Sequence, residues 1–206
     1  MATHVTSSLK RATTSWRTID LMTAAMIGVV FGVVYWGWSS AYTALSTPIS
    51  NAVGPAIGLL GGPWLIAGVV GGLVVRRLGA ALLAEFLAAL VSALIGNEWG
   101  AATLISGLLQ GLGVEVALAI FLFTRFTPLV AVLGGILAAL FEWLYELNAY
   151  WQGTTLDFKL GYLFFFALSG AVVAGLGGWA LTRALAATGA IDALPAGEEA
   201  AHNRAV

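Results

Sequence analysis

RRLGAALLAEFLAALVSALIGNEWG, residues 76–100, has the pattern of a helix that crosses a membrane. Two arginines precede an apolar run at 79–96 whose only charged residue is Glu85, and a polar turn follows the run. A helix needs about 20 mostly apolar residues to cross the hydrocarbon core of a bilayer. The stretch therefore predicts a transmembrane helix between a basic turn and a polar turn.

Five further runs of similar length and polarity lie on both sides of this stretch. They span residues 21–38, 53–75, 101–123, 129–150 and 160–181. None alternates apolar and polar residues as a barrel strand does, and only helices and closed barrels satisfy every backbone group in lipid. The sequence therefore predicts an all-α integral membrane protein with a six-helix transmembrane bundle at residues 19–184. We expect a cytoplasmic tail at 1–18 and a second, disordered cytoplasmic tail at 185–206.

The composition excludes several classes of protein. Of the 206 residues, 60% are hydrophobic and 9% are charged, whereas about 25% of the residues of a soluble domain are charged. Nine Lys and Arg residues and a net charge of -1 give nucleic acid nothing to bind. The chain has no cysteine, and His4 and His202 both lie in the polar tails, so we expect no disulfide, no metal site and no cofactor. The sequence also has no phosphate-binding loop and no Ser-His-Asp set in its spans, which argues against an enzyme.

The basic residues predict how the chain is oriented. With the N-terminus in the cytoplasm, only Lys159 lies outside, and the other eight of the nine Lys and Arg residues lie inside. These eight are Lys10, Arg11, Arg17, Arg76, Arg77, Arg125, Arg183 and Arg204. Because Lys and Arg are enriched in cytoplasmic loops, the sequence predicts that both termini are inside.

Four glutamates lie within the predicted spans, and each needs a partner or a purpose. A charged side chain at the centre of a membrane helix costs about 2.5–3.5 kcal/mol on insertion scales. The four are Glu85, Glu115, Glu142 and Glu146, and the spans contain no Lys or Arg that could neutralise them. Protons or a cationic or amine-bearing ligand must therefore balance some of them. Any single one can instead be an interhelical hydrogen-bonding group, and Glu115, deepest from the outer face, fits this alternative best.

Aromatic residues near these glutamates favour a flat cationic ligand. Rings beside carboxylates attract such a ligand through cation–π contacts of about 0.5–2 kcal/mol each. Trp16, Trp151 and Trp179 fit the aromatic belt at the membrane surface, whereas Trp99 in the outer turn is the best candidate for ligand contact. An anionic ligand would need an Arg or Lys here, and the spans offer none.

Four motifs of the chain resemble those of one known family. They are Trp16-Arg17-Thr18-Ile19-Asp20, Arg76-Arg77-x-Gly79-Ala80 followed by Ala84-Glu85, Gly96-Asn97-x-Trp99-Gly100, and Gly107-x-x-Gln110-Gly111-x-Gly113-x-Glu115. With these motifs, residues 16–183 resemble the substrate-binding (S) components of energy-coupling factor (ECF) vitamin importers, and among them the YkoE-like thiamine/hydroxymethylpyrimidine type.

The resemblance implies a six-helix subunit in the cell membrane of a prokaryote. Such a subunit captures thiamine, or its hydroxymethylpyrimidine precursor, from outside and works with a transmembrane coupling (T) subunit and two cytosolic ATPases. In S components an Ala-x-x-x-Ala stripe on the first helix contacts the coupling subunit. Ala24, Gly28 and Gly32 form a similar stripe here and are the candidate partner interface. The same stripe also fits packing inside the molecule, because small residues let any two helices approach closely.

The expected ligand site combines the residue chemistry with this resemblance. Thiamine joins a permanently cationic thiazolium to an aminopyrimidine, so carboxylates, amides and aromatic rings suit its two halves. The expected substrate-binding residues are Glu85, Asn97, Trp99, Gln110, Glu142, Tyr145 and Glu146. The further candidates are Trp36, Trp64, Glu98 and Glu115.

Two other functions fit the same residues. A proton-coupled exporter of organic cations would also need membrane glutamates and tryptophans, and it would transport its substrate without partner subunits. A membrane scaffold would bind no small molecule. Transport by the chain alone under a pH gradient separates the exporter from a binding subunit.

Overall fold

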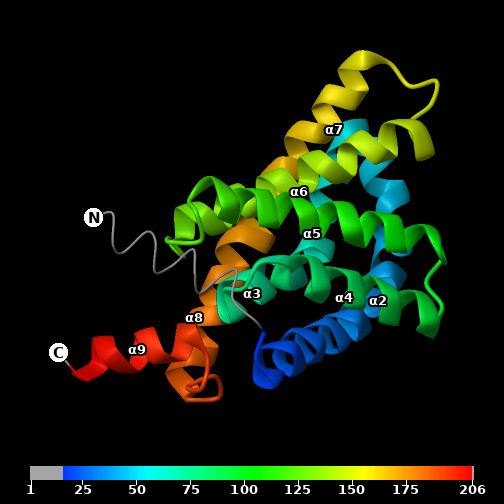
Figure 1. Cartoon of the computed structure of the whole chain (residues 1–206). Helices are drawn as coiled ribbons and strands as arrows, with labels where there is room; N and C mark the ends of the chain where they lie inside the picture. The colour runs from blue at the N-terminus through cyan, green and yellow to red at the C-terminus, as the bar shows by residue number, and fades with distance from the viewer. Residues whose placement is uncertain (1–15, 206) are drawn as a thin grey trace.

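The structure, a computed structural model, describes residues 16–205 (Figure 1). All of its secondary-structure elements are helices. His4, Lys10, Arg11 and most of the tail predicted at 1–18 lie outside the described residues. The elements in chain order are α2 (Thr18–Val53), η1 (Gly54–Leu60), η2 (Gly62–Leu65), α3 (Ile66–Val75), α4 (Ala80–Ile95), α5 (Ala102–Ile120), α6 (Pro128–Ala149), α7 (Leu156–Ser169), η3 (Gly170–Gly177), α8 (Gly178–Thr188) and α9 (Pro195–Ala205). No strand occurs between residues 16 and 205, so the prediction of an all-helical fold is confirmed.

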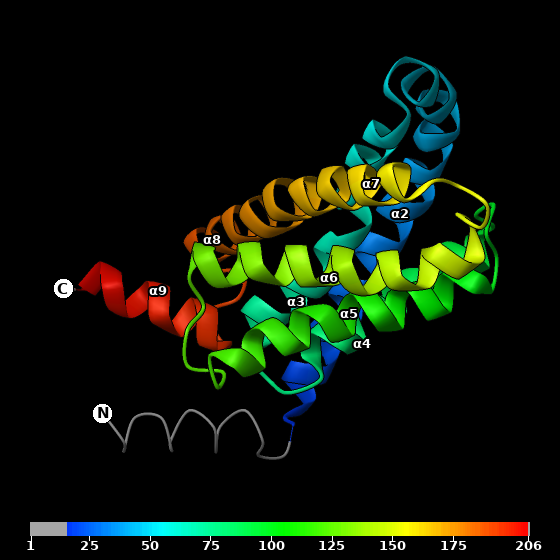
Figure 2. The same ribbon diagram turned by 90° about the horizontal axis from the view of Figure 1, so that it is seen from above.

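The helices pack around α3. Nine of the ten residues of α3 are buried. α2, α4, α5 and α6 lie next to one another in that order, and α7, η3 and α8 form a rod across α6 (Figure 2). Within residues 16–205, four segments are long and apolar enough to cross a membrane, and α4 is an apolar helix of 16 residues. The chain is thus a multi-pass membrane protein, while the count of six spans and the inward direction of both termini stay predictions.

α2 is longer than the predicted span. It begins at Thr18, ends at Val53 and has 36 residues, with Pro48 inside it, whereas the sequence predicted a span at 21–38. The apolar run ends at Trp38, but the residues that follow it can continue the helix outside the lipid. The change from apolar to polar residues therefore shows where the membrane span ends and does not show where the helix ends. The helix ends before Gly54-Pro55, because a proline disfavours helical geometry at the residue before it.

The predicted span at 53–75 is broken into η1, η2 and α3. Pro55 and Pro63 stand near the starts of the two 3-10 helices. Gly58 brings the chain close to α7, since a Cβ at this position would lie 2.6 Å from the carbonyl oxygen of Tyr162. The break leaves the backbone N–H groups at the start of α3 free to bind side chains of other helices.

The small-residue stripe of α2 packs inside the molecule. Ala24, Gly28 and Gly32 are buried on the side of α2 that faces α4, and a Cβ added at Gly28 would lie 2.5 Å from the Cβ of Leu87. These contacts match the alternative that the stripe packs inside the molecule, and the expectation that Ala24, Gly28 and Gly32 contact a partner subunit stays a prediction. The outward face of α2 carries the exposed Met22 and Met26 instead.

The C-terminal segment is helical, although the sequence predicted a disordered tail at 185–206. α8 continues to Thr188, and α9 follows after a turn. Ile191, Leu194, Ala196 and Ala200 are buried in a cluster with residues of α3 such as Val70 and Val74. The sequence did not indicate this helix because its buried positions are mostly alanines. An alanine buries little area, so the pattern of apolar and polar residues is weak.

Ion pairs join three segments at one end of the bundle. Asp20, which is fully buried, accepts hydrogen bonds from Arg17 Nη2 at 2.8 Å and from Arg77 Nε at 2.9 Å. Arg76 pairs with Glu199 of α9. These contacts place the start of α2, the α3–α4 turn and α9 at the same end, which is the basic end that the sequence predicted to be cytoplasmic.

Candidate ligand-binding site

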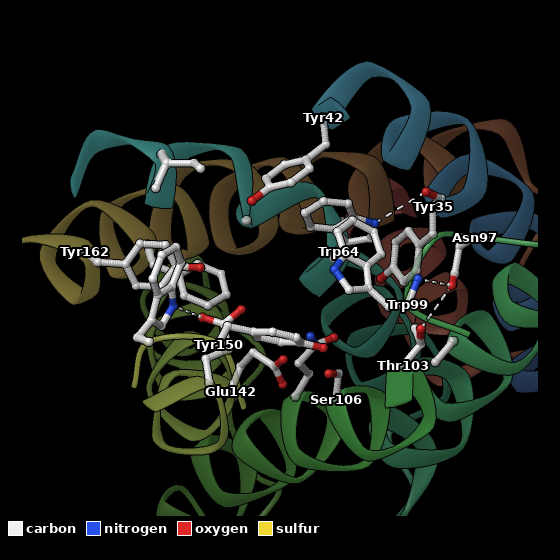
Figure 3. A pocket seen from close by; sticks show the side chains of 17 residues that line it. Tyr35, Tyr42, Trp64, Asn97, Trp99, Thr103, Ser106, Glu142, Tyr150 and Tyr162 are labelled. Carbon is white, nitrogen blue, oxygen red and sulfur yellow. Dashed lines mark hydrogen bonds between the residues drawn. The ribbon is translucent and has the colours of Figure 1, made fainter. Parts of the chain in front are cut away.

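A cavity of about 220 Å³ lies toward the other end of the bundle (Figure 3). Its walls come from α2, η1, η2, α4, α5, α6 and α7, from Gly61 between η1 and η2, and from the turns that follow α4 and α6. The lining residues are Tyr35, Tyr42, Ile57, Gly61, Trp64, Ala89, Asn97, Trp99, Thr103, Ser106, Gln110, Glu142, Glu146, Tyr150, Trp151, Tyr162 and Phe166. Residues that are far apart in the sequence therefore form one site.

Two glutamates of α6 supply the acidic side of the cavity. Glu142 and Glu146 are one helical turn apart, so they share a face of α6. Glu142 is 3% exposed, and its Oε2 has no hydrogen-bond partner. Ser106 and Gln110 of α5 lie beside its carboxylate. A buried carboxylate oxygen without a partner is costly to leave empty, so Glu142 is available for a ligand group that donates a hydrogen bond or carries a positive charge.

Glu146 is held more closely by aromatic side chains. Its Oε2 lies 3.5 Å from Nε1 of Trp151, and the hydroxyl of Tyr162 faces the same carboxylate. Both partners follow α6 in the chain and lie at the α6–α7 turn or on α7. Glu146 therefore joins the acidic side of the cavity to one aromatic wall.

One aromatic wall comes from η2, α2 and the α4–α5 turn. The rings of Trp64 and Trp99 meet edge to face, with centroids 5.2 Å apart. Tyr42 contacts both of these rings, and its centroid lies 5.2 Å from Trp64 and 5.5 Å from Trp99. Trp38 stands behind Trp64 and donates from Nε1 to the carbonyl oxygen of Leu60 at 2.9 Å. The arrangement gives a wall whose rings are fixed by one another.

A second aromatic wall faces the first across the cavity (Figure 3). The ring of Tyr162 packs against Trp151 and Phe166, with centroids 5.0 and 5.6 Å apart. Phe158 packs behind this group. A flat ligand between the two walls would meet rings on both sides and carboxylates on a third.

Asn97 holds the rim in place. Its Oδ1 accepts hydrogen bonds from the backbone N–H of Trp99 at 3.1 Å and of Gly100 at 2.7 Å. Its Nδ2 donates to Ser92 Oγ at 3.0 Å and to Thr103 Oγ1 at 3.1 Å. Because these bonds occupy both ends of the amide, Asn97 lines the cavity chiefly by positioning the Trp99 turn.

Glu85 lies beneath the cavity and does not line it. It is fully buried, and its Oε2 accepts from the backbone N–H of Gly68 at 2.6 Å. Its Oε1 accepts from the Tyr35 hydroxyl at 2.9 Å, and this hydroxyl accepts from the N–H of Ala67. The side-chain amide of Gln110 is oriented so that its nitrogen donates to Glu85 Oε1 at 3.3 Å and to the carbonyl oxygen of Trp64 at 3.0 Å. Glu85 and Tyr35 thus cap the N-terminus of α3, where negative charge is favoured.

Glu115 caps a second helix in the same way. Its Oε1 accepts from the backbone N–H of Ala81 at 2.8 Å and of Leu82 at 3.4 Å, both in the first turn of α4. These bonds match the alternative that Glu115 joins helices. Its Oε2 has no hydrogen-bond partner, but the residue is buried away from the cavity and so is not placed to meet a ligand there.

Of the residues that the sequence predicted for the site, some line the cavity and others do not. Asn97, Trp99, Gln110, Glu142 and Glu146 line the cavity, and so does Trp64. Four candidates do not line it: Glu85, Glu115, Tyr145 and Trp36. Glu98 also lies outside the lining and accepts from the Thr43 hydroxyl at 3.0 Å on the exposed side of the turn.

Several lining residues were missed in the sequence. Trp151 fits an interfacial belt by its position near a span end, yet it lines the cavity. Tyr162 and Phe166 lie four residues apart on α7, a spacing that places them on one face. That spacing was the available signal, but it is equally typical of packing between helices.

The lining is acidic and aromatic. It contains no Lys, Arg or His side chain among the residues that the structure describes. Residues 16–205 also hold no group of three or more His, Asp or Glu side chains that could bind a metal ion. The arrangement can accept hydrogen bonds from an amine, offset a positive charge and stack on a flat ring.

Comparisons with known proteins relate the whole chain to transporter subunits. A family described as "ABC-type cobalt transport system, permease component" matches residues 19–141. A curated protein of Bacillus subtilis (strain 168), named as an HMP/thiamine permease, YkoE, is 33% identical in an alignment of 193 positions that covers 90% of this chain and 92% of that protein. A crystal structure of an S-component of an ECF transporter superposes with a TM-score of 0.86 at 30% identity, over 92% of this chain and 95% of that one. These relatives are transporter subunits rather than enzymes.

Proposed function

The chain belongs to the family of substrate-binding (S) components of ECF transporters, and from this premise we propose that it binds thiamine or the hydroxymethylpyrimidine precursor of thiamine. The ligand occupies the cavity between α2, α5, α6 and α7. The name of the relative YkoE supports this choice of ligand. The observation that carries the proposal is a cavity with two carboxylates, two aromatic walls and no basic side chain among its lining residues.

The chemistry of thiamine matches this lining. The exocyclic amine of its pyrimidine needs an acceptor, and the unpartnered Oε2 of Glu142 offers one. Ser106 and Gln110 lie close enough to that carboxylate to meet the ring nitrogens. The thiazolium needs negative charge and a ring face, which Glu146 and the aromatic walls supply.

Release of the ligand into the cell requires partners that this chain lacks. We propose a transmembrane coupling (T) subunit and two cytosolic ATPases, because the sequence has no phosphate-binding loop. The burial of Ala24 and Gly28 against α4 supports a contact with the T subunit elsewhere on the chain.

Isothermal titration of the purified chain with thiamine and with hydroxymethylpyrimidine tests the binding. We expect saturable binding of at least one of them with one site per chain. An organic anion of similar size serves as the control and should not bind, because the lining offers it no cation. Absence of binding with both pyrimidines would contradict the proposal.

A transport assay separates a binding subunit from a complete transporter. Proteoliposomes that contain only this chain should bind thiamine without accumulating or expelling it under a pH gradient. Transport driven by the gradient alone would contradict the proposal and would favour a proton-coupled exporter.

A further inference from the structure

Glu142 and Glu146 form a carboxylate pair at close quarters. Side chains four residues apart on a helix have Cβ atoms about 5–6 Å from each other. Both line the cavity, and Glu142 is 3% exposed. The pair therefore lies in a poorly solvated space where like charges repel strongly.

No basic group faces this pair. The titratable groups that interact with it from the surrounding elements are all acids: Tyr42 of α2, Glu85 of α4, Tyr150 of the α6–α7 turn and Tyr162 of α7. Glu98 at the rim is also an acid and interacts with Tyr42. Among the described residues, the hydrogen-bond donors beside the pair are neutral: Ser106 lies beside Glu142, and Trp151 and Tyr162 lie beside Glu146. Nothing on the described part of the protein can offset two negative charges here.

Two carboxylates that share a site without a counter-charge do not both ionise at neutral pH. One proton shared between them lowers the repulsion, and such a pair titrates as a unit. The empty cavity then carries one negative charge. A ligand with one permanent positive charge can replace that proton without changing the total charge of the cavity.

We propose that the Glu142/Glu146 pair holds about one proton when the cavity is empty, that a permanently cationic ligand displaces this proton, and that the pair thereby selects the cation over a neutral pyrimidine. This inference rests on the proposed function. The carboxyl O–H bond breaks, the proton passes to water at the rim, and the carboxylate that forms faces the cation. The cavity holds a net charge of -1 before and after binding, since two carboxylates and one cation replace one carboxylate and one carboxylic acid.

The proposal predicts a selectivity that depends on pH. Each proton released on binding strengthens the affinity by up to about tenfold for each unit of rising pH. Thiamine should therefore bind more tightly as pH rises through the range in which the pair holds its proton. Neutral hydroxymethylpyrimidine leaves the proton in place, so its affinity should stay nearly constant, and the ratio of the two affinities should grow.

Titration calorimetry in several buffers of one pH measures the proton directly. The enthalpy of binding varies with the ionisation enthalpy of the buffer, and the slope of that dependence counts the protons released. For the full chain in detergent at neutral pH, where the empty pair holds its proton, we expect a count of about one for thiamine and about zero for hydroxymethylpyrimidine.

Variants of the two glutamates test whether the released proton comes from the Glu142/Glu146 pair. Glu146→Gln removes the repulsion, so the count for thiamine should fall to near zero. Glu98→Gln makes the same chemical change outside the lining and should leave the count at the wild-type value. If Glu146→Gln lowers the thermal unfolding temperature strongly, Glu142→Gln replaces it, with the same expected loss of the released proton.

The outcomes of the calorimetry distinguish failure of this inference from failure of the proposed function. Thiamine binding with a count near zero in the wild-type chain would overturn this inference and leave the proposed function standing. An equal count for thiamine and hydroxymethylpyrimidine would also overturn it, because the pair would not distinguish charge. Absence of heat with both ligands would overturn the proposed function and this inference together.

Discussion

Two pairs of glutamates lie in the apolar segments of the same membrane protein and have different partners. Glu85 and Glu115 each accept backbone N–H groups from the first turn of a neighbouring helix, at 2.6 Å from Gly68 and at 2.8 Å from Ala81. Glu142 and Glu146 line a cavity instead. Glu115 Oε2 and Glu142 Oε2 both lack a hydrogen-bond partner, but of these two residues only Glu142 lines the cavity.

The difference shows what decides the role of an intramembrane carboxylate. Helix N-termini carry unsatisfied N–H groups and a partial positive charge, so a glutamate that reaches one becomes part of the fold. A glutamate that reaches none must find its partner elsewhere, in a proton or a ligand. Substitutions at the first pair should therefore change stability, and substitutions at the second pair should change binding.

The largest effect is expected for Glu85→Ala. The change leaves the N–H of Gly68 and the hydroxyl of Tyr35 without their acceptor. At about 1–3 kcal/mol for each unsatisfied buried donor, the free energy of unfolding should fall by about 2–6 kcal/mol. Thermal unfolding in detergent measures this loss. Glu85→Gln keeps an oxygen for one donor and should lose less, whereas an unchanged unfolding temperature for Glu85→Ala would remove the distinction between the two pairs.

Glu142→Gln should have the next largest effect, and on binding. The affinity for thiamine should fall by about 1.5–3 kcal/mol, or roughly 10- to 100-fold, because a hydrogen bond to a charged group is lost. The unfolding temperature should not fall, since Glu142 Oε2 has no partner in the fold. Calorimetry and thermal unfolding of one preparation give both values. Equal thiamine affinity in Glu142→Gln and wild-type chains would show that this carboxylate is not a ligand group.

The same contrast can be drawn for the tryptophans. Trp99→Leu removes a ring from the cavity wall, and the affinity for thiamine should fall by about 0.5–2 kcal/mol. Trp36→Leu is the matched control, because Trp36 is 40% exposed and does not line the cavity. A larger loss of affinity for Trp36→Leu than for Trp99→Leu would place the ligand elsewhere.

The smallest effect is expected for a carboxylate at the basic end. Glu199 pairs with Arg76 and is half exposed, so Glu199→Gln should lower the free energy of unfolding by less than about 1 kcal/mol. Thiamine affinity should not change, because α9 lies at the other end of the bundle. A clear loss of affinity in this variant would mean that the two ends are coupled.

The sequence predicted the class of fold well because lipid imposes a simple rule. Every backbone group must be paired within the segment, so a long apolar run indicates a helix wherever it occurs. That rule does not apply outside the lipid. It therefore missed the extension of α2 beyond Trp38 and the packing of α9, which depend on contacts between distant segments such as the pair of Arg76 and Glu199.

The site was predicted in part for a related reason. The absence of basic residues from the spans indicated a cavity suited to a cation, and Glu142, Glu146 and Gln110 do line one. The sequence could not separate these from Glu85, because the partner of Glu85 is the N–H of Gly68, which becomes available only where η2 gives way to α3. The same limit applies to Gly28, whose small size fits equally well against α4 or against a second protein.

A crystal structure of the chain with bound thiamine tests the central claim most directly. The account predicts thiamine in the cavity between Trp64 and Tyr162, with a nitrogen of the ligand about 3 Å from a carboxylate oxygen of Glu142. It also predicts that Glu85 and Glu115 keep their backbone partners and do not touch the ligand. Thiamine bound at another place, or in contact with Glu85 instead of Glu142, would contradict the account.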